Sequence, residues 1–498
     1  MVFSSALFLF LFLPLCLAAY WAFPRRAQNG VLLAASLLFY AWGSPAALVW
    51  MLASITLNHA LGLQVARKDG WLARPGRREL LLTSAVALNL GLLMWFKYAG
   101  FCYEQVRLLA GACGLELPVW TSSPALPIGI SFYTFQALSY VVDVYRGEVP
   151  AQRSWSRLAL YIAFFPQLVA GPIVRYSDFA RDLVRRTVTL EGAAAGARRI
   201  AVGLCKKLLL ADSFAACVDT VFELPDAGMT PALARLALVC YTLQIYFDFS
   251  GYSDMAIGLG KLFGFTFPEN FQYPYCATSV TDFWRRWHLS LSTWFRDYVY
   301  IPLGGNRGGM ARTCRNLLVV FVLCGLWHGA NWTFLAWGLF HGAFLAAERL
   351  LARTDTHRAP GLPMVLLARA YTLLVIVTGW SLFRSDDLSQ AARLVATAWG
   401  AQAGDAGAYP LAQYLDGPLV VLVAIGIVGA TPWPGRAMQA LNDWCDGRSD
   451  GKAQSRLPGR VVAWVWWGVR ATLPVAALLL VSILIAASTY SPFIYFRF

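Results

Sequence analysis

Long stretches of apolar residues with few charges recur along the chain, and they constrain its fold more than any other feature. About 20 mostly apolar residues are enough for one helix to cross a bilayer. Only 14% of the residues are charged, against roughly 25% in soluble domains. A soluble fold of this length could not cover its surface with so few polar groups. The sequence therefore predicts an all-α, polytopic integral membrane protein.

The predicted spans differ in length, and several are short for a full crossing. Pro127 and Pro166 interrupt two of them. Broken or re-entrant helices are tolerated at membrane depth where protein or a water-filled cavity surrounds them. No polar connection is long enough for a second folded domain, so residues 1–498 are expected to form one membrane domain. The predicted spans are 3–22, 31–43, 45–63, 80–98, 124–144, 157–174, 231–246, 250–265, 315–329, 332–350, 363–383, 417–432 and 471–489.

Basic residues gather in short loops between the apolar stretches, and they predict the orientation of the chain. The formal net charge is +14, but this distribution follows the positive-inside rule and gives no reason to expect nucleic-acid binding. Loops 24–30 and 64–79 are both predicted to be cytoplasmic, which makes 31–63 a hairpin. The basic loop before the last span is cytoplasmic too, so both termini are expected outside. Residues 3–22 lack the basic N-terminal region and the cleavage site of a signal peptide, so we expect them to form a retained span.

Two carboxylates lie in an otherwise apolar stretch, Tyr246-Phe-Asp-Phe-Ser-Gly-Tyr-Ser-Asp254. A carboxylate inside a membrane is costly and marks a functional site by default. The alternative is that Asp248 and Asp254 form buried polar contacts that fasten helices together. Both interpretations stay open at this level.

Residues 281–298 combine aromatic and basic side chains at helical spacing. In one helix, Arg285, His288 and Arg296 would share a face, opposite a face of tryptophans. Such an amphipathic helix could lie in the membrane interface or line a cavity with its basic face toward an anion. Arginines suit bidentate contacts with phosphate, so Arg285 and Arg296 are candidates for binding a phosphate-bearing ligand.

A histidine follows Trp327 inside another apolar stretch, Cys324-Gly-Leu-Trp-His328-Gly-Ala-Asn331-Trp332. Imidazole titrates near neutral pH, so His328 is the natural candidate for proton transfer, although a structural histidine remains possible. His341 could share its site only if the helix breaks, for which Gly329 is the candidate position. Motifs of soluble enzymes and convincingly spaced metal ligands are absent from the sequence.

Together these segments resemble the membrane-bound O-acyltransferase family, in particular the bacterial branch whose membrane subunits serve the O-acetylation of alginate or cellulose. The resemblance covers most of residues 1–350, where the motifs stand in the family's order, and is weak over 351–460. Its motifs are Met1-Val-Phe-Ser-Ser, Leu126-Pro-Ile-Gly-Ile-Ser-Phe-Tyr, Val142-Asp-Val-Tyr-Arg-Gly, Phe165-Pro-Gln-Leu-Val-Ala-Gly-Pro, Tyr246-Phe-Asp-Phe-Ser-Gly-Tyr-Ser-Asp-Met-Ala, Phe283-Trp-Arg-Arg-Trp-His, Leu303-Gly-Gly-Asn306-Arg307-Gly-Gly, Leu326-Trp-His-Gly-Ala-Asn-Trp and Phe493-Ile-Tyr-Phe-Arg-Phe.

This resemblance implies about a dozen transmembrane helices, with re-entrant or interfacial helices, around a catalytic tunnel. It implies that His328 is the catalytic residue and that His288 matches a second polar position of the site. The donor would be acetyl-CoA on the cytoplasmic side of a bacterial inner membrane, with no metal. The acetyl group would pass outward to a partner acetyltransferase of the SGNH-hydrolase type, which works with the exopolysaccharide synthesis machinery.

The residues fit this chemistry. A base must deprotonate the hydroxyl that attacks the thioester, and the carbonyl oxygen needs donors as charge develops. We assign the first role to His328 and expect Asn331 or Trp332 to contribute to the second. Supporting roles are expected for Asp248, Asp254 and Trp327, and binding of the donor for Arg285, Arg296, Asn306 and Arg307.

Two other functions fit the same sequence features. Acyl transfer to peptidoglycan, teichoic acid, lipid or protein would use the same residues with a different acceptor. A transporter or flippase would also have broken helices and intramembrane charges, but the chain shows no inverted repeat, and Trp327-His328-Gly329 would have no role. Thioester cleavage by the purified protein separates the enzymes from the transporters.

The short aromatic tail Ser491–Phe498 yields a first testable prediction. Exposed aromatic and arginine side chains are typical of binding hot spots, whereas interfacial anchoring is the competing interpretation. We expect the tail to help dock the external partner. Deletion of Phe493–Phe498 should spare acetyl-CoA binding and reduce acetylation of the exported polymer. Retention of both the co-purified partner and full polymer acetylation would show that the tail is only an anchor.

Overall fold

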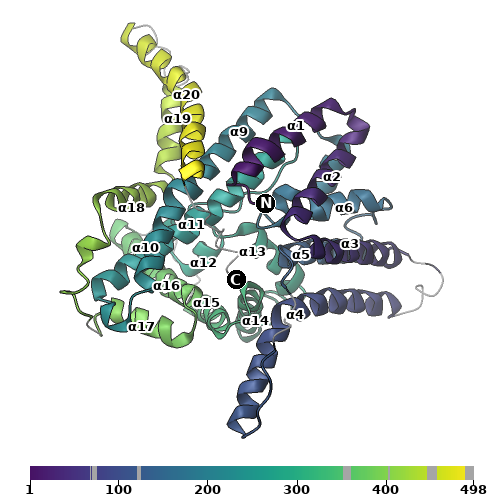
Figure 1. Ribbon diagram of the computed structural model, residues 1–498. Helices are drawn as coiled ribbons and strands as arrows, with labels where there is room; N and C mark the ends of the chain where they lie inside the picture. Colours follow the sequence, from purple (N-terminus) through teal and green to yellow (C-terminus); the bar gives the residue numbers. More distant parts are fainter. Residues whose placement is uncertain are drawn as a thin grey trace.

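The computed structural model describes residues 1–67, 69, 76–120, 125–351, 361–401, 404–445 and 457–487. Within these ranges the secondary structure is helical, which confirms the predicted all-α membrane fold (Figure 1). The tail Ser491–Phe498 lies outside the described residues, as do the basic residues Lys452 and Arg456.

Seven helices in the described part of the chain are long and apolar enough to cross a membrane. An eighth span results if α18 (Gly417–Gly429) and α19 (Trp433–Cys445), which meet at 69°, are counted as one broken crossing. The protein is thus multi-pass. The seven are α3 (Pro45–Val65), α4 (Arg77–Ala112), α11 (Pro231–Leu262), α14 (Met310–His328), α15 (Trp332–Leu351), α16 (Leu362–Arg384) and the part Trp464–Ala486 of α20 (Leu457–Ala487).

Shorter elements account for several of the other predicted spans. The first span consists of a π-helical turn, η1, that continues into α1, and the predicted span 157–174 breaks at Phe164 into two short helices. The chain turns at Ser44, between the predicted spans 31–43 and 45–63, and the Ser44 side chain accepts a hydrogen bond from the Ala47 N–H. These elements are η1 (Phe8–Phe12), α1 (Leu13–Ala22), α2 (Arg25–Gly43), α5 (Ile130–Arg146), α6 (Trp155–Ala163), α7 (Phe165–Leu168), α8 (Tyr176–Arg185) and α9 (Leu190–Cys205).

The helix α11 lies at the centre of the molecule, and most of its side chains are buried. It corrects the sequence prediction, which divided this segment into two spans, 231–246 and 250–265. Gly251 lies inside the continuous helix and packs closely against Gly203 of a neighbouring helix. The remaining elements are η3 (Lys206–Ala211), α10 (Asp212–Phe222), η4 (Asp226–Gly228), η5 (Pro274–Cys276), α12 (Val280–Trp284), α13 (Leu289–Phe295), η6 (Arg296–Tyr300), α17 (Leu388–Ala398) and η7 (Leu411–Gln413).

Four glycines allow α9 and α11 to approach each other closely. A Cβ on Gly196 would lie 2.7 Å from the Gly258 carbonyl oxygen, and one on Gly203 would lie 2.5 Å from that of Gly251. The reciprocal positions are equally tight. Small residues at helix contacts are typical of membrane proteins, where close backbone approach replaces the hydrophobic effect as the source of association.

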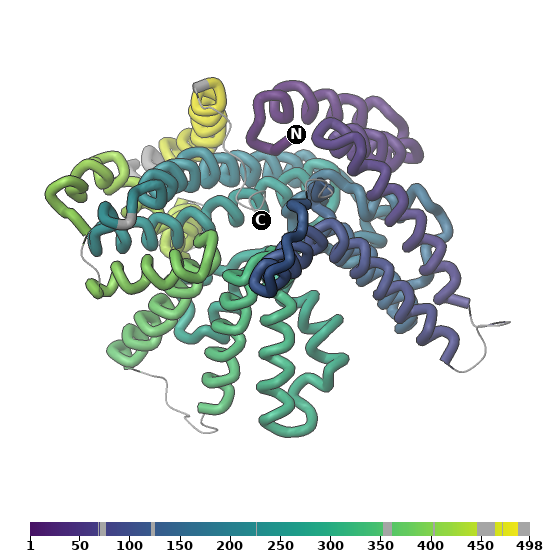
Figure 2. The backbone as a smooth tube through the Cα atoms, turned by 60° about the horizontal axis from the view of Figure 1, so that its bottom comes forward, coloured from purple at the N-terminus to yellow at the C-terminus, as the bar shows by residue number. Residues whose placement is uncertain are grey.

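The helices α14 and α15 run side by side as a hairpin, with α16 next to α15 (Figure 2). Gly325 and Gly338 face each other across the hairpin, and a side chain on either would collide with the opposite backbone. The short helix α12 lies against α14, α15 and α16, and His288, the residue before α13, packs against Phe249 of α11 (Figure 1). This arrangement brings residues 281–298 and the end of α14 to one place.

Gly203→Val tests the packing of α9 on α11. The larger side chain would overlap the Gly251 backbone, and overpacking of this kind costs about 1–3 kcal/mol. We expect less monodisperse protein after detergent extraction and a lower midpoint of thermal unfolding. Gly91→Val is the matched control, because an added Cβ at Gly91 meets no atom within 4 Å. Equal stability of the two variants would contradict this account of the contact.

Candidate active site

The helix α14 ends at His328, and the chain breaks there. Gly329 adopts an extended conformation (φ −166°, ψ 157°), and α15 begins three residues later at Trp332. A Cβ on Gly329 would collide with the ring of Phe334, so a larger residue here would displace that ring. The chain thus breaks at the candidate position, Gly329, and the break places His328 at a helix end between two cavities, although it does not bring His341 to them.

Aromatic rings surround the buried imidazole of His328. The ring centroids of Trp327, Trp337 and Phe383 lie 4.9, 5.2 and 5.0 Å from that of His328. Trp327 also stacks on Phe135, with the ring centroids 5.6 Å apart. These contacts fix the orientation of the imidazole and exclude bulk water from three directions.

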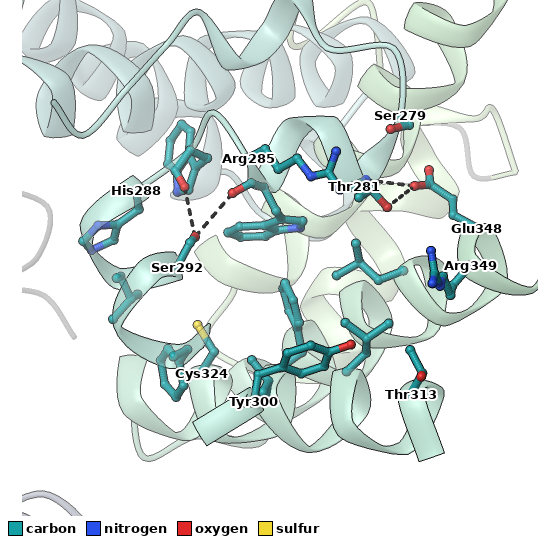
Figure 3. Close-up of a pocket in the computed structure, with 18 of the residues that line it drawn as sticks. Ser279, Thr281, Arg285, His288, Ser292, Tyr300, Thr313, Cys324, Glu348 and Arg349 are labelled. Carbon is teal, nitrogen blue, oxygen red and sulfur yellow. Dashed lines mark hydrogen bonds between the residues drawn. The ribbon is translucent and has the colours of Figure 1, made fainter. Parts of the chain in front are cut away.

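A cavity of about 770 Å³ opens on one side of His328. Aromatic and aliphatic side chains form most of its wall, and polar side chains are distributed among them. Figure 3 places His288 at one end of this cavity and Glu348 and Arg349 at the other. Its polar lining comprises Ser279, Thr281, Arg285, His288, Ser292, Tyr300, Asn306, Thr313, His328, Glu348, Arg349 and Tyr371.

A second cavity of about 180 Å³ lies on the other side of His328. Lys97 of α4, the start of α5 around Ile130, and Trp327 contribute to its wall. Among the described residues, His328 is the one that lines both cavities. A group bound in either cavity can therefore reach the same imidazole.

The prediction of one continuous helix over 281–298 is wrong. The chain forms α12, then a turn through Arg285–His288, and then α13, and His288 takes a left-handed conformation with φ 45°. Asn270 explains the turn, since its side-chain oxygen accepts hydrogen bonds from the Ser290 N–H (3.1 Å) and hydroxyl (2.8 Å). The Asn270 carbonyl also accepts from the Leu289 N–H, at 3.0 Å.

The same turn directs His288 into the large cavity. Its Nδ1 lies 3.3 Å from the Asn270 side-chain oxygen, and its ring packs edge-on against Phe249. Its Nε2 has no hydrogen-bond partner within the described ranges. His288 and His328, which the family resemblance assigned to the catalytic site, thus line one cavity.

The three neighbouring arginines differ in their surroundings. Arg285 lines the large cavity and takes part in no ion pair among the described residues. Arg286 pairs with Asp282 at 2.8 Å. Arg296 pairs with Asp297 at 2.6 Å and lies outside the cavity lining.

Of the two candidates in the glycine-rich motif, one reaches the cavity. Asn306 lines it and accepts a hydrogen bond from the Tyr300 hydroxyl at 2.6 Å, whereas Arg307 is exposed and lies outside the cavity lining.

Sequence reasoning missed Glu348 and Arg349, two charged residues in the last turn of the apolar helix α15 that line the large cavity. The Glu348 carboxylate accepts from the Val280 N–H (2.7 Å) and the Thr281 N–H (2.8 Å), which ties α15 to the start of α12.

The two intramembrane carboxylates form ion pairs with lysine and arginine side chains of neighbouring helices. Asp248 lies 3.0 Å from the Lys207 ammonium, which also pairs with Asp212. Asp254 pairs with Arg199 (2.8 Å) and Lys206 (2.7 Å). Neither carboxylate lines the large or the small cavity. This geometry favours the interpretation in which both fasten α9 and η3 to α11.

The expected donors for the carbonyl oxygen, Asn331 and Trp332, are directed elsewhere. Asn331 donates to the Asp386 carbonyl at 2.7 Å, and the Trp332 ring N–H donates to Gln105 at 3.1 Å.

His341 lies behind Trp337, with the ring centroids 5.1 Å apart, and lines neither cavity. In the part of the chain that the structure describes, no group of three or more His, Cys, Asp or Glu residues could hold a metal ion.

Comparison with known proteins agrees with this geometry. Residues 152–359 match the model of the membrane-bound O-acyltransferase family. The chain is also 42% identical to the protein named "Probable alginate O-acetylase AlgI" of Pseudomonas putida, over 100% of both chains. The chain belongs to the membrane-bound O-acyltransferase family.

Further members of this family extend the comparison. The protein of the same name from Azotobacter vinelandii is 46% identical over 80% of this chain and 77% of its own. The peptidoglycan O-acetyltransferase of Helicobacter pylori is 33% identical over 79% of each chain. As a family member, the protein is a membrane-bound acyltransferase.

Proposed function

We propose that this protein is an O-acetyltransferase that takes acetyl groups from cytoplasmic acetyl-CoA and passes them across the inner membrane for O-acetylation of an exported polysaccharide. One observation carries the proposal: among the residues that the structure describes, His328 alone lines both the large and the small cavity. An enzyme that receives its donor on one side and delivers the acyl group to the other needs its reactive group at such a junction.

The chemistry requires one proton acceptor and two substrates that meet at it. The His328 imidazole takes the proton of the acceptor hydroxyl, whose oxygen then bonds to the thioester carbon. The carbon–sulfur bond breaks as the tetrahedral intermediate collapses, and the imidazolium returns its proton to the departing thiolate. The aromatic rings around His328 limit access of water, which would otherwise hydrolyse the thioester.

The large cavity suits the donor. Its volume of about 770 Å³ falls in the range of small-molecule sites, and its wall is mainly apolar with a few polar groups. The guanidinium groups of Arg285 and Arg349 provide positive charge for the phosphates of coenzyme A. Because acetyl-CoA is made in the cytoplasm, we propose that this cavity opens to the cytoplasm and that both termini lie outside.

The relatives support a polysaccharide acceptor. Two of them carry alginate in their name, and the first is similar over its whole length. We therefore propose alginate, or a similar exopolysaccharide such as cellulose, and a partner acetyltransferase of the SGNH type that acts outside. Peptidoglycan is the second candidate, favoured by the likeness to the Helicobacter pylori enzyme. All of residues 1–498 would work as one domain.

His328→Ala tests the proposed base. The variant should keep its abundance in the membrane and lose acetylation of the polymer, because loss of a general base costs orders of magnitude in rate. The measurement is acetate released from the exported polymer, normalised to membrane protein. His341→Ala is a matched control, since His341 is buried in the same region but lines neither cavity. More than about a tenth of wild-type activity in His328→Ala would exclude the base role.

Arg285→Ala tests the donor site. Loss of one charged hydrogen bond of about 1.5 kcal/mol should raise the apparent KM for acetyl-CoA about tenfold with little change in kcat. Arg286→Ala is the matched control, because the neighbouring guanidinium is occupied by Asp282. The measurement is the rate of free coenzyme A release by purified protein over a range of acetyl-CoA concentrations. An unchanged KM in Arg285→Ala would remove Arg285 from the donor site.

A further inference from the structure

A lysine of α4 contacts the helix end that carries His328. The Lys97 ammonium donates hydrogen bonds to the carbonyl oxygens of Trp327 (2.5 Å) and His328 (2.7 Å). These are the last two residues of α14, whose final carbonyls have no N–H partner within the helix. The same end carries the negative pole of the helix dipole, so a cation is favoured there.

The next residue along α4 binds the same turn. The Tyr98 hydroxyl donates to the Leu326 carbonyl and lies 3.3 Å from that of Gly329. Lys97 and Tyr98 together therefore contact four consecutive carbonyl groups, from Leu326 to Gly329. The break after α14 is thus held in place from outside the α14–α15 hairpin.

Lys97 differs from Tyr98 in two respects. It lines the small cavity together with His328, whereas Tyr98 does not. It is also an ionisable side chain within a candidate membrane span, which is costly in a bilayer. In the part of the chain that the structure describes, its hydrogen-bond partners are neutral carbonyl groups. The Tyr98 hydroxyl shows that a neutral donor can bind carbonyls of this turn, but the Lys97 ammonium adds a positive charge that matches the negative pole of the helix dipole.

We propose that Lys97 is a positioning residue for acyl transfer: its ammonium fixes the end of α14, so that the His328 imidazole stays at the junction of the two cavities. This inference rests on the proposed role of His328 as the base. Without the ammonium, the last turn of α14 can fray and the imidazole can move away from the junction. A displacement of about 1 Å at a reacting group lowers turnover about a hundredfold.

The test compares Lys97→Ala, Lys97→Met, Lys97→Arg and Tyr98→Phe in the purified full-length protein with acetyl-CoA. Lys97→Ala should lower kcat about a hundredfold and leave the KM for acetyl-CoA unchanged, because Lys97 does not line the large cavity. Added ethylamine should restore part of the turnover of Lys97→Ala, since the small cavity beside Lys97 is large enough for it. Ethanol, of similar size and without charge, should not.

The conservative variants supply a second readout. Lys97→Arg should retain more turnover than Lys97→Met, which has similar length and no charge. Tyr98→Phe is the comparison variant: it loses hydrogen bonds to the same turn but keeps the ammonium, and should lose less turnover than Lys97→Ala. Thermal unfolding and size-exclusion profiles of each variant show whether it is folded.

Three results would overturn the inference. The first is full turnover in Lys97→Ala, and the second is a raised KM for acetyl-CoA with unchanged kcat in the same variant. The third is rescue of Lys97→Ala that does not distinguish ethylamine from ethanol, whether both restore turnover equally or neither restores it. His328→Ala, measured in parallel, separates this inference from the proposed function. An active His328→Ala would overturn the base role itself. An inactive His328→Ala beside a fully active Lys97→Ala would overturn only the role of Lys97.

Discussion

The end of α14 is a helix terminus buried inside a membrane protein, and the site depends on how its backbone carbonyls are satisfied. In a bilayer, water is not available for groups that the helix leaves unpaired, and each unsatisfied group costs several kcal/mol. Lys97 and Tyr98 bind these carbonyls from α4. The chain can therefore break at Gly329, turn back as α15, and leave His328 between two cavities.

Three kinds of interaction hold the surrounding helices in register. Glycine contacts set the distance between α9 and α11, and between α14 and α15. Buried ion pairs, such as Lys207 with Asp248, join α11 to its neighbours. Aromatic rings from α14, α15 and α16 enclose the imidazole. The large cavity is lined mainly by side chains of α12 to α15 and of the turn through Arg285–His288.

The membrane fold was predicted from the length of the apolar stretches, and Gly329 was recognised as the candidate position for a helix break. The placing of His288 and His328 at one site came from the family resemblance, whereas the apolar surroundings of His328 were a local signal. The helix over 281–298 was predicted wrongly because its interruption depends on Asn270, a partner outside the segment. Likewise, nothing in the spacing of Asp248 and Asp254 reveals that Lys207, Arg199 and Lys206 neutralise them. Lys97 had a local signal, a lone lysine in an apolar span, but its contact with α14 joins residues far apart in the chain.

We propose that donor and acceptor reach His328 from opposite cavities. A cryo-electron microscopy structure of the protein with a non-hydrolysable acetyl-CoA analogue tests this most directly. We expect the pantetheine arm in the large cavity, between Arg285 and His328. The acetyl carbonyl carbon should lie within about 3.5 Å of the position of an acceptor oxygen beside the imidazole. Density for the analogue in the small cavity, or an acetyl group bound away from His328, would contradict this proposal.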